Sequence, residues 1–97
     1  MFLSRITVVG HSMEPTILEN QKVLATSVPY FFIEPKVGDI VVCKANNSKK
    51  LYIKRIKKMQ GRNFFVEGDN KKDSFDSRKF GSIKRKEILG KVIWTYS

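Results

Sequence analysis

The chain has 97 residues, of which 19 are Lys or Arg and 9 are Asp or Glu, so its formal net charge is +10 at neutral pH. This length excludes a two-domain layout, and we expect a single domain over residues 1–97. The charge favours phosphate-rich partners, either anionic lipid or nucleic acid, without choosing between them. No apolar stretch approaches the roughly 20 residues of a membrane span, and the start of the chain lacks the apolar segment of a secretory signal.

Short extended segments alternate with turn residues along the chain, at intervals too small for crossover helices. This pattern predicts a mainly β fold, a small and partly closed antiparallel barrel or sheet with at most one or two short helical turns. Strands are predicted over residues 5–9, 22–28, 40–44, 51–58, 64–67 and 88–95, and helical turns near residues 12–15 and 83–87. Residues 70–81 are predicted to form a long polar loop, which in so small a domain usually has a function.

The first chemical candidate is Ser12, which stands between a glycine and a proline in a predicted turn. A serine in this setting is most often a turn former or an N-cap. Gly10, however, lets the chain turn sharply, and Pro15 fixes the entry to the next turn. This tight setting would expose the Ser12 hydroxyl and the amides that follow it, so Ser12 is a candidate nucleophile.

The second candidate is Lys54, in the strand predicted over residues 51–58. Strand alternation places Tyr52, Lys54 and Ile56 on one face, so the lysine would point into the domain between two large hydrophobic side chains. Desolvation there would lower the pKa of the amine far enough for it to act as a general base. Taken alone, the strand favours the plainer interpretation, a surface lysine on an edge strand.

Two other reactive residue types are less informative. His11 adjoins Ser12, but successive side chains in extended backbone point apart, so an exposed turn residue is the better interpretation. Cys43 is the one cysteine, which excludes an internal disulfide, and its apolar run predicts a buried structural thiol. One His and one Cys are too few for zinc, so we expect no metal site and no cofactor.

Taken together, these segments resemble the type I signal peptidase family, membrane-associated serine proteases that remove export signals. The resemblance covers about residues 8–94. Its four blocks are the serine box Gly-His-Ser-Met-Glu-Pro-Thr at 10–16, Lys-Val-Gly-Asp-Ile-Val at 36–41, the lysine box Tyr-Ile-Lys-Arg at 52–55, and the last box at 67–81. Self-cleaving repressors of the DNA-damage response share the serine box. The Gly-Asp-Asn…Asp-Ser-Arg pattern of the last box is far more specific.

The resemblance implies a Ser–Lys dyad, with Ser12 as nucleophile and Lys54 as the base that takes its proton. Ser74 matches the position whose hydroxyl orients the lysine amine. A supporting network of paired carboxylates and guanidinium groups is implied for Arg55, Asp69, Asp76 and Arg78. The oxyanion hole would use the Ser12 backbone amide. Members with a serine two residues earlier also use that hydroxyl, whereas this chain has Gly10, so the stabilisation rests on backbone groups.

The substrate would lie as an extended strand between residues 6–10 and 51–53, held by main-chain hydrogen bonds. The residues expected to contact it are Ile6, Val8, Val9, Gly10, Leu51, Tyr52 and Ile53. In the family, shallow pockets accept small residues, commonly alanine, one and three places before the cut. The partner is therefore the leader or signal peptide of a precursor protein.

Residues 28–35 form a second segment of interest, an aromatic run bounded by prolines. It is either part of the core or an exposed wedge, with Tyr30, Phe31 and Phe32 dipping into the headgroup region while lysines bind anionic lipid. The apolar surface near the active site of family members favours the wedge. We therefore expect a membrane-associated protein at the extracytoplasmic face, or a cytoplasmic one if it is a soluble maturation protease.

The chain departs from most family members at two places. Only eleven residues precede Ser12, where most members have a membrane span. The anchor has been trimmed, or a partner supplies it, or the chain is a minimal relative such as the proteases that clip the leader of nickel superoxide dismutase. Only twelve residues separate Arg55 from Gly68, so the large second β-domain of many bacterial enzymes is absent.

The sequence thus predicts a serine endopeptidase with a Ser–Lys dyad that removes N-terminal signal or leader peptides after small residues. Two alternatives remain open. One is a self-cleaving regulator of the repressor type, which is disfavoured because no cleavable domain precedes Ser12. The other is a non-catalytic basic β-barrel that binds nucleic acid, stacking bases on Phe64 or Phe65. Nucleic acid is ranked last as a partner.

Overall fold

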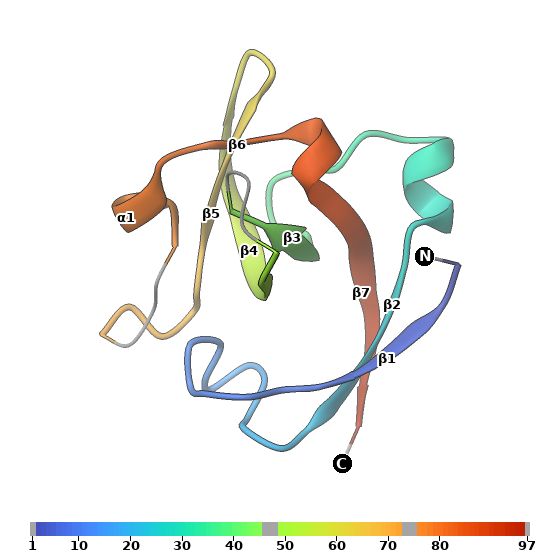
Figure 1. Ribbon diagram of the computed structural model, residues 1–97, viewed down its shortest axis with the longest axis vertical. Helices are drawn as coiled ribbons and strands as arrows, with labels where there is room; N and C mark the ends of the chain where they lie inside the picture. The colour runs from blue at the N-terminus through green and yellow to red at the C-terminus, as the bar shows by residue number, and fades with distance from the viewer. Residues whose placement is uncertain (1, 46–48, 73–75, 97) are drawn as a thin grey trace.

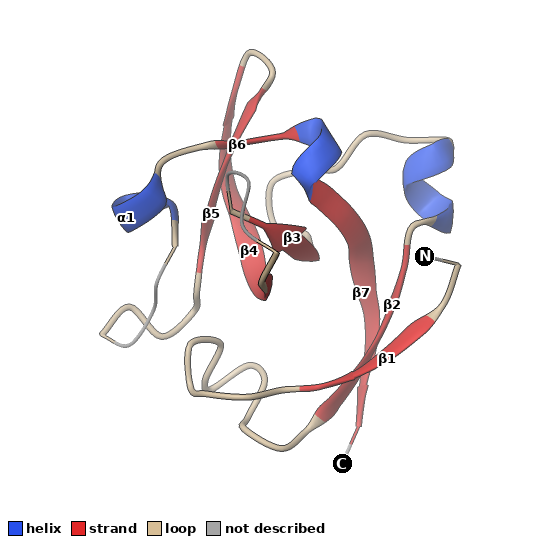
Figure 2. Ribbon diagram, in the orientation of Figure 1, coloured by secondary structure: helices blue, strands red, loops and turns tan. Residues whose placement is uncertain are grey.

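The computed structural model describes residues 2–45, 49–72 and 76–96. Its strands are β1 (Ser4–Thr7), β2 (Lys22–Thr26), β3 (Ile40–Lys44), β4 (Leu51–Gln60), β5 (Asn63–Glu67), β6 (Ile83–Lys84) and β7 (Ile88–Tyr96). Three short helical segments join them: the helix α1 (Ser77–Phe80) and the 3-10 turns η1 (Val28–Phe31) and η2 (Arg85–Glu87). In Figures 1 and 2 the sheet is strongly curved, with η1 just after β2, η2 just before β7 and α1 just before β6.

All seven strands belong to one antiparallel sheet with the spatial order β1-β2-β7-β3-β4-β5-β6. The last strand, β7, lies between β2 and β3 and therefore joins the beginning of the chain to its middle. Register shifts next to Leu24 and Val42 mark β-bulges on either side of β7, and bulges increase the local bend of a sheet. The sheet curls into a half-barrel (Figure 1), which confirms the predicted mainly β, partly closed fold.

The curvature divides the apolar side chains into two clusters. The larger contains Tyr30, Val41, Cys43, Ile56, Phe64, Val66, Ile83 and Ile88. The smaller contains Val8, Met13, Ile17 and Val23, with Ile6, Ile40, Ile53 and Val92 packed against it. Strands β3 and β4 supply residues to both clusters. Cys43 is fully buried, as predicted, and burial raises the pKa of its thiol to about 12.

Most predicted strands are confirmed with boundaries shifted by a few residues, and the strand over residues 40–44 has the predicted limits. The predicted polar loop over residues 70–81 was wrong at its end, which forms α1. Asp76 caps this helix by accepting a hydrogen bond from the backbone N–H of Arg78 at 3.1 Å. Gly81, at φ 83°, ends it. Within the described ranges, no helix is long and apolar enough to cross a membrane.

Candidate active site

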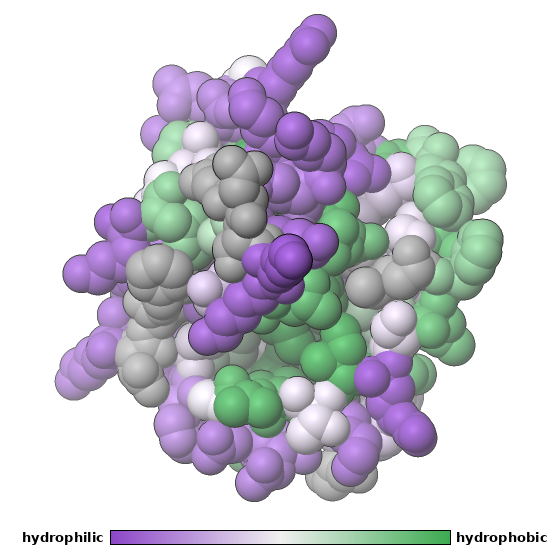
Figure 3. All heavy atoms as spheres, in the orientation of Figure 1, coloured by the Kyte–Doolittle hydropathy of each residue, from purple (hydrophilic) through white to green (hydrophobic). Residues whose placement is uncertain are grey.

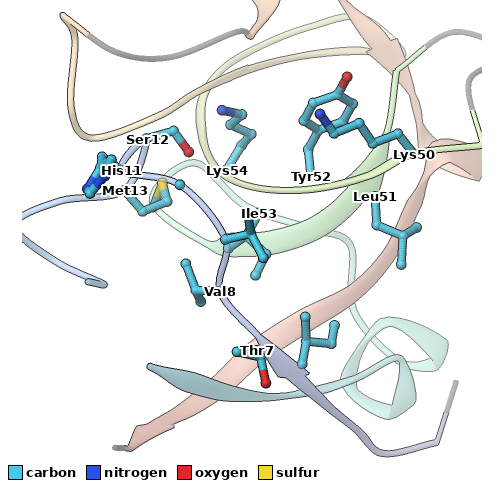
Figure 4. Close-up of a pocket in the computed structure, with 13 residues that line it drawn as sticks. Thr7, Val8, His11, Ser12, Met13, Lys50, Leu51, Tyr52, Ile53 and Lys54 are labelled. Atoms are coloured by element: carbon cyan, nitrogen blue, oxygen red, sulfur yellow. The ribbon is translucent and has the colours of Figure 1, made fainter. Parts of the chain in front are cut away.

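A cleft of about 550 Å³ lies between the chain segment that follows β1 and the beginning of β4. This volume is in the usual range for ligand sites. The lining residues are Ile6, Thr7, Val8, Val9, Gly10, His11, Ser12 and Met13 from one wall, and Lys50, Leu51, Tyr52, Ile53 and Lys54 from the other (Figure 4). The structure therefore brings together Ser12, Lys54 and all seven residues predicted to contact substrate. Their roles remain predictions.

Ser12 sits in the loop after β1, where its side chain is half-buried. The turn at Gly10 has φ 89°, a left-handed conformation that favours glycine. The loop is also held by Asn70, which follows β5 and whose backbone N–H donates to the Ser12 carbonyl at 2.8 Å. The Asn70 side-chain amide also donates to the His11 carbonyl at 3.1 Å. The position of Ser12 thus depends on the segment that follows β5.

Lys54 is the buried lysine of the cleft lining, with 2% of its surface exposed. It lies opposite Val41 in the β3–β4 ladder, and its amine lies 5.8 Å from the centre of the Tyr52 ring. Burial lowers the pKa of Lys54, because removing the ammonium from water disfavours the charged form. The negative charge of Asp76 opposes this shift, whereas the positive charges of Arg78 and Lys50 add to it. The inward orientation predicted from strand alternation is confirmed.

The Ser12 hydroxyl and the Lys54 amine point toward the same part of the cleft from facing walls (Figure 4). A serine hydroxyl needs a base to take its proton, and a neutral amine has the lone pair required. The low exposure of Lys54 and its lowered pKa favour the neutral form at this position. The arrangement can therefore support nucleophilic attack by serine with lysine as general base.

A bidentate ion pair connects the lysine strand to the last box of the sequence. Arg55 donates from Nε and from a terminal nitrogen to the two carboxylate oxygens of Asp69, each at 2.9 Å. Arg55 also donates to the Gly38 carbonyl at 2.9 Å. Asp69 in turn accepts a hydrogen bond from the Thr16 hydroxyl at 2.5 Å. The carboxylate thus joins β4 to the loop that carries Ser12, and the two hydrogen-bonded partners lower its pKa.

A second ion pair organises the base of α1. Asp76 is fully buried and accepts from Arg78 Nε at 2.9 Å and from a terminal Arg78 nitrogen at 2.7 Å. The Gly68 N–H also donates to Asp76 at 2.9 Å. The two expected carboxylate–guanidinium pairs are therefore present, although no observation tests their role in catalysis. Ser74 lies outside the described residues, so its predicted contact with Lys54 stays a prediction.

Polar contacts that sequence analysis missed hold the Ser12 loop from its own side. The Gly10 N–H donates to the Glu19 carboxylate at 3.0 Å. His11 is exposed, as predicted, and pairs with Glu14 at 2.6 Å and with Glu19 at 3.5 Å. Because Gly10 N–H already has an acceptor, the Ser12 amide is the better candidate for an oxyanion donor. No sequence pattern pointed to Glu19, because its contact depends on how the loop folds back.

The predicted aromatic wedge requires one correction. Tyr30 is only 6% exposed, and its hydroxyl donates to Asp39 at 2.7 Å. Arg85 lies against the Tyr30 ring and also donates to its backbone carbonyl. Tyr30 is therefore a core residue that cannot enter a membrane, whereas Phe31 and Phe32 are exposed. The 3-10 turn η1 explains this division, since successive side chains in a turn of three residues point about 120° apart, so one can face the core while the next two face outward.

The fold and the cleft together define a class of protein: a small, curved β-sheet domain with a serine hydroxyl and a buried lysine amine in one cleft. Comparison of the sequence with families narrows this class. A family model described as signal peptidase, peptidase S26, matches residues 1–63 and 57–97. The chain belongs to this peptidase family, as its sequence motifs predicted.

Relatives with peptidase names support this assignment. Thylakoidal processing peptidase 1 of Arabidopsis thaliana is 28% identical over 88% of this chain, and mitochondrial inner membrane protease subunit 1 of Mus musculus is 32% identical over 91%. Signal peptidase I of Buchnera aphidicola is 36% identical over 55% of the chain. The matches cover 39%, 68% and 19% of these relatives. The chain therefore spans well under half of the thylakoidal relative.

The Asp69 contacts yield a first prediction. Asp69→Ala leaves the Arg55 guanidinium and the Thr16 hydroxyl without this acceptor, so we expect a loss of about 1–3 kcal/mol in the free energy of unfolding. Asp69→Asn keeps one acceptor oxygen and should lose less. Denaturant unfolding of the three proteins measures this order, and an Asp69→Ala protein as stable as wild type would contradict it.

Proposed function

We propose that this protein is a serine endopeptidase that removes N-terminal signal or leader peptides from precursor proteins, with Ser12 as nucleophile and Lys54 as general base. The observation that carries the proposal is the pairing of a half-buried serine with a lysine of 2% exposure across one cleft. Membership of the signal peptidase family supports the reaction class. A Ser–Lys pair would follow the triad logic without a histidine.

In the proposed reaction, the neutral Lys54 amine takes the proton of the Ser12 hydroxyl as its oxygen attacks the scissile carbonyl. An ester to Ser12 forms and the peptide C–N bond breaks, while Lys54 returns the proton to the leaving amine. Lys54 then activates a water molecule, whose attack frees Ser12. The Ser12 backbone amide is the proposed oxyanion donor, and Gly10 allows the close approach of the substrate backbone.

The position of β1 at the edge of the sheet supports an extended substrate. In the described part of the chain, β1 pairs only with β2, and the segment that follows it lines one wall of the cleft. Residues 50–54 line the other wall. A peptide strand can therefore add to the outer edge of β1, which is the usual form of strand addition. Small residues one and three places before the cut are the proposed specificity, as the resemblance implies.

We also propose that an exposed apolar patch contacts a membrane. This patch, called here the aromatic patch, consists of Phe2, Leu3, Val28, Phe31, Phe32 and Ile33. Phe32 is 84% exposed, and the Phe2 and Phe31 rings meet edge to face with centroids 6.4 Å apart. Figure 3 shows apolar surface on the flank that carries η1. Aromatic side chains on a cationic protein suit an anionic lipid surface.

Other partners of the proposed enzyme follow from the resemblance alone. It implies the extracytoplasmic face of the membrane as the place of action. It also makes a membrane-anchoring partner one way to hold the catalytic domain near its substrates. The aromatic patch supports a membrane location without selecting a side.

The dyad gives the next prediction. Ser12→Ala and Lys54→Met should each lower kcat/KM by about 10³-fold or more, because each removes one half of the proton transfer. The matched controls Ser82→Ala and Lys49→Met, outside the cleft lining, should retain activity. The assay is mass spectrometry of a leader peptide with alanine one and three places before the cut. Substantial turnover by either dyad variant would exclude the proposed mechanism.

The pH dependence follows from the lowered pKa of Lys54. Only the neutral amine is a base, so kcat/KM should rise with pH, with a midpoint below the pKa of an exposed lysine. The unfolded chain binds this proton more tightly than the native protein. Wild-type stability should therefore rise with pH relative to Lys54→Met, from the native pKa of Lys54 up to its unfolded value. A pH series of melting temperatures and rates checks both, and a flat difference between the two proteins would argue against a perturbed amine.

Membrane contact predicts a fourth result. The double variant Phe31→Ser, Phe32→Ser should bind severalfold more weakly than wild type to phosphatidylcholine vesicles containing phosphatidylserine. The double variant Ile93→Ser, Trp94→Ser removes exposed apolar surface outside the aromatic patch and should bind like wild type. Co-sedimentation measures the binding. Equal and salt-independent binding by wild type and the Phe31/Phe32 variant would refute the membrane contact.

A further inference from the structure

Lys50 is a second cation of the cleft that the proposed reaction does not use. It directly precedes β4, lines the same wall as Leu51 and Tyr52, and is exposed. Its amine lies 5.3 Å from the centre of the Tyr52 ring, which holds the charge by a cation–π contact. Figure 4 shows the Lys50 side chain extending along the Tyr52 ring.

Both lysine amines of the cleft wall lie near the Tyr52 ring. The Lys54 amine is 5.8 Å from the ring centre and the Lys50 amine is 5.3 Å from it, so both amines have defined positions relative to one rigid side chain. Phe80 supports the ring with its centroid 6.0 Å away. Lys50 also contributes to the lowering of the Lys54 pKa, although burial is the larger cause. The Lys50 charge therefore has a defined place relative to the candidate dyad.

The other residues of the cleft lining decide which substrate side chains this charge can favour. Among the described residues that line the cleft, none is Asp or Glu, and most are apolar. A substrate side chain that meets this wall thus finds an exposed cation at one end and the buried lysine at the other. Electrostatic complementarity of this kind selects between partners more than it increases affinity.

We propose that Lys50 is a specificity-determining residue that favours substrates with an acidic side chain two to four residues from the scissile bond. The spacing follows from the strand: Lys50 and Lys54 are four residues apart, or about 13 Å in extended backbone. A substrate strand paired alongside would present the matching side chain four residues from the one near Lys54. Because the Lys50 side chain lies over Tyr52, its amine also reaches a substrate residue only two places from the one near Lys54.

This inference rests on the proposed peptidase function for its location of the scissile bond, but its charge preference can be measured without cleavage. The probe is a twelve-residue leader peptide with alanine one and three places before the cut. Glu, Gln or Lys is placed in turn at each position from two to four residues on either side, except those alanines. Binding to Ser12→Ala by fluorescence anisotropy gives the preference when turnover is absent, and kcat/KM of the serine-containing protein gives it for the reaction.

Wild type should favour the Glu peptide over the Lys peptide about three- to fivefold at one or two of these positions, as expected for an exposed ion pair at low salt. Lys50→Glu should invert this ratio, and 0.5 M salt should abolish it. The matched control Lys49→Glu makes the same change in net charge one residue away, outside the cleft lining, and should keep the wild-type ratio.

Three results would overturn the inference: equal Glu-to-Lys ratios in wild type and Lys50→Glu, the same inversion by Lys49→Glu, or a preference that is equal at every position. The last two would mean that the overall charge of the protein sets the preference. If the peptides bind with the expected inversion but no cleavage occurs, the proposed peptidase function fails while the role of Lys50 in recognition stands. If cleavage occurs but does not depend on the charge at position 50, the role of Lys50 fails while the proposed peptidase function stands.

Discussion

The burial of one amine is the constraint on which this structure depends. Lys54 is 2% exposed. Its cross-strand partner Val41 and the next residue on the same face of β4, Ile56, are both fully buried. A charged ammonium at such a position is costly, because the low dielectric interior replaces little of its hydration. Burial therefore lowers the pKa of Lys54, and the negative charge of Asp76 opposes that shift. A lowered pKa is what the proposed role of Lys54 as a general base requires.

The Arg55–Asp69 ion pair helps to fix the two walls of the cleft relative to each other. Ser12 is carried by a loop and Lys54 by a strand, so their relative position depends on contacts between the two. Asp69 contacts both sides through Arg55 and Thr16, and the following Asn70 holds the Ser12 carbonyl. Bidentate pairs fix direction as well as distance, which explains why arginine rather than lysine suits this position. The last box of the sequence is therefore a connector between the walls of the cleft.

Local patterns in the sequence were sufficient for most of the strands and for the direction of Lys54, because alternation and turn residues act over a few positions. They were wrong at Ile83–Lys84, which forms β6 although residues 83–87 were predicted as a helical turn. The strand over residues 40–44 has the predicted limits, and Cys43 is buried as expected. Long-range contacts were beyond this reasoning. Tyr30 is buried, with its hydroxyl bonded to Asp39 and its carbonyl to Arg85. The sequence around Tyr30 does not indicate either contact. The insertion of β7 between β2 and β3 is another contact between distant segments.

The incomplete closure of the sheet is best understood together with the cleft. Unpaired strand edges are usually a liability, since they invite association with other chains. Here the edge strand β1 and the segment that follows it lie beside the cleft, and residues 50–54 line the opposite wall. A peptide strand in this place would supply the hydrogen bonds that a closed barrel would otherwise make within itself. In the proposed reaction, the opening of the half-barrel would therefore also be the site of the extended substrate.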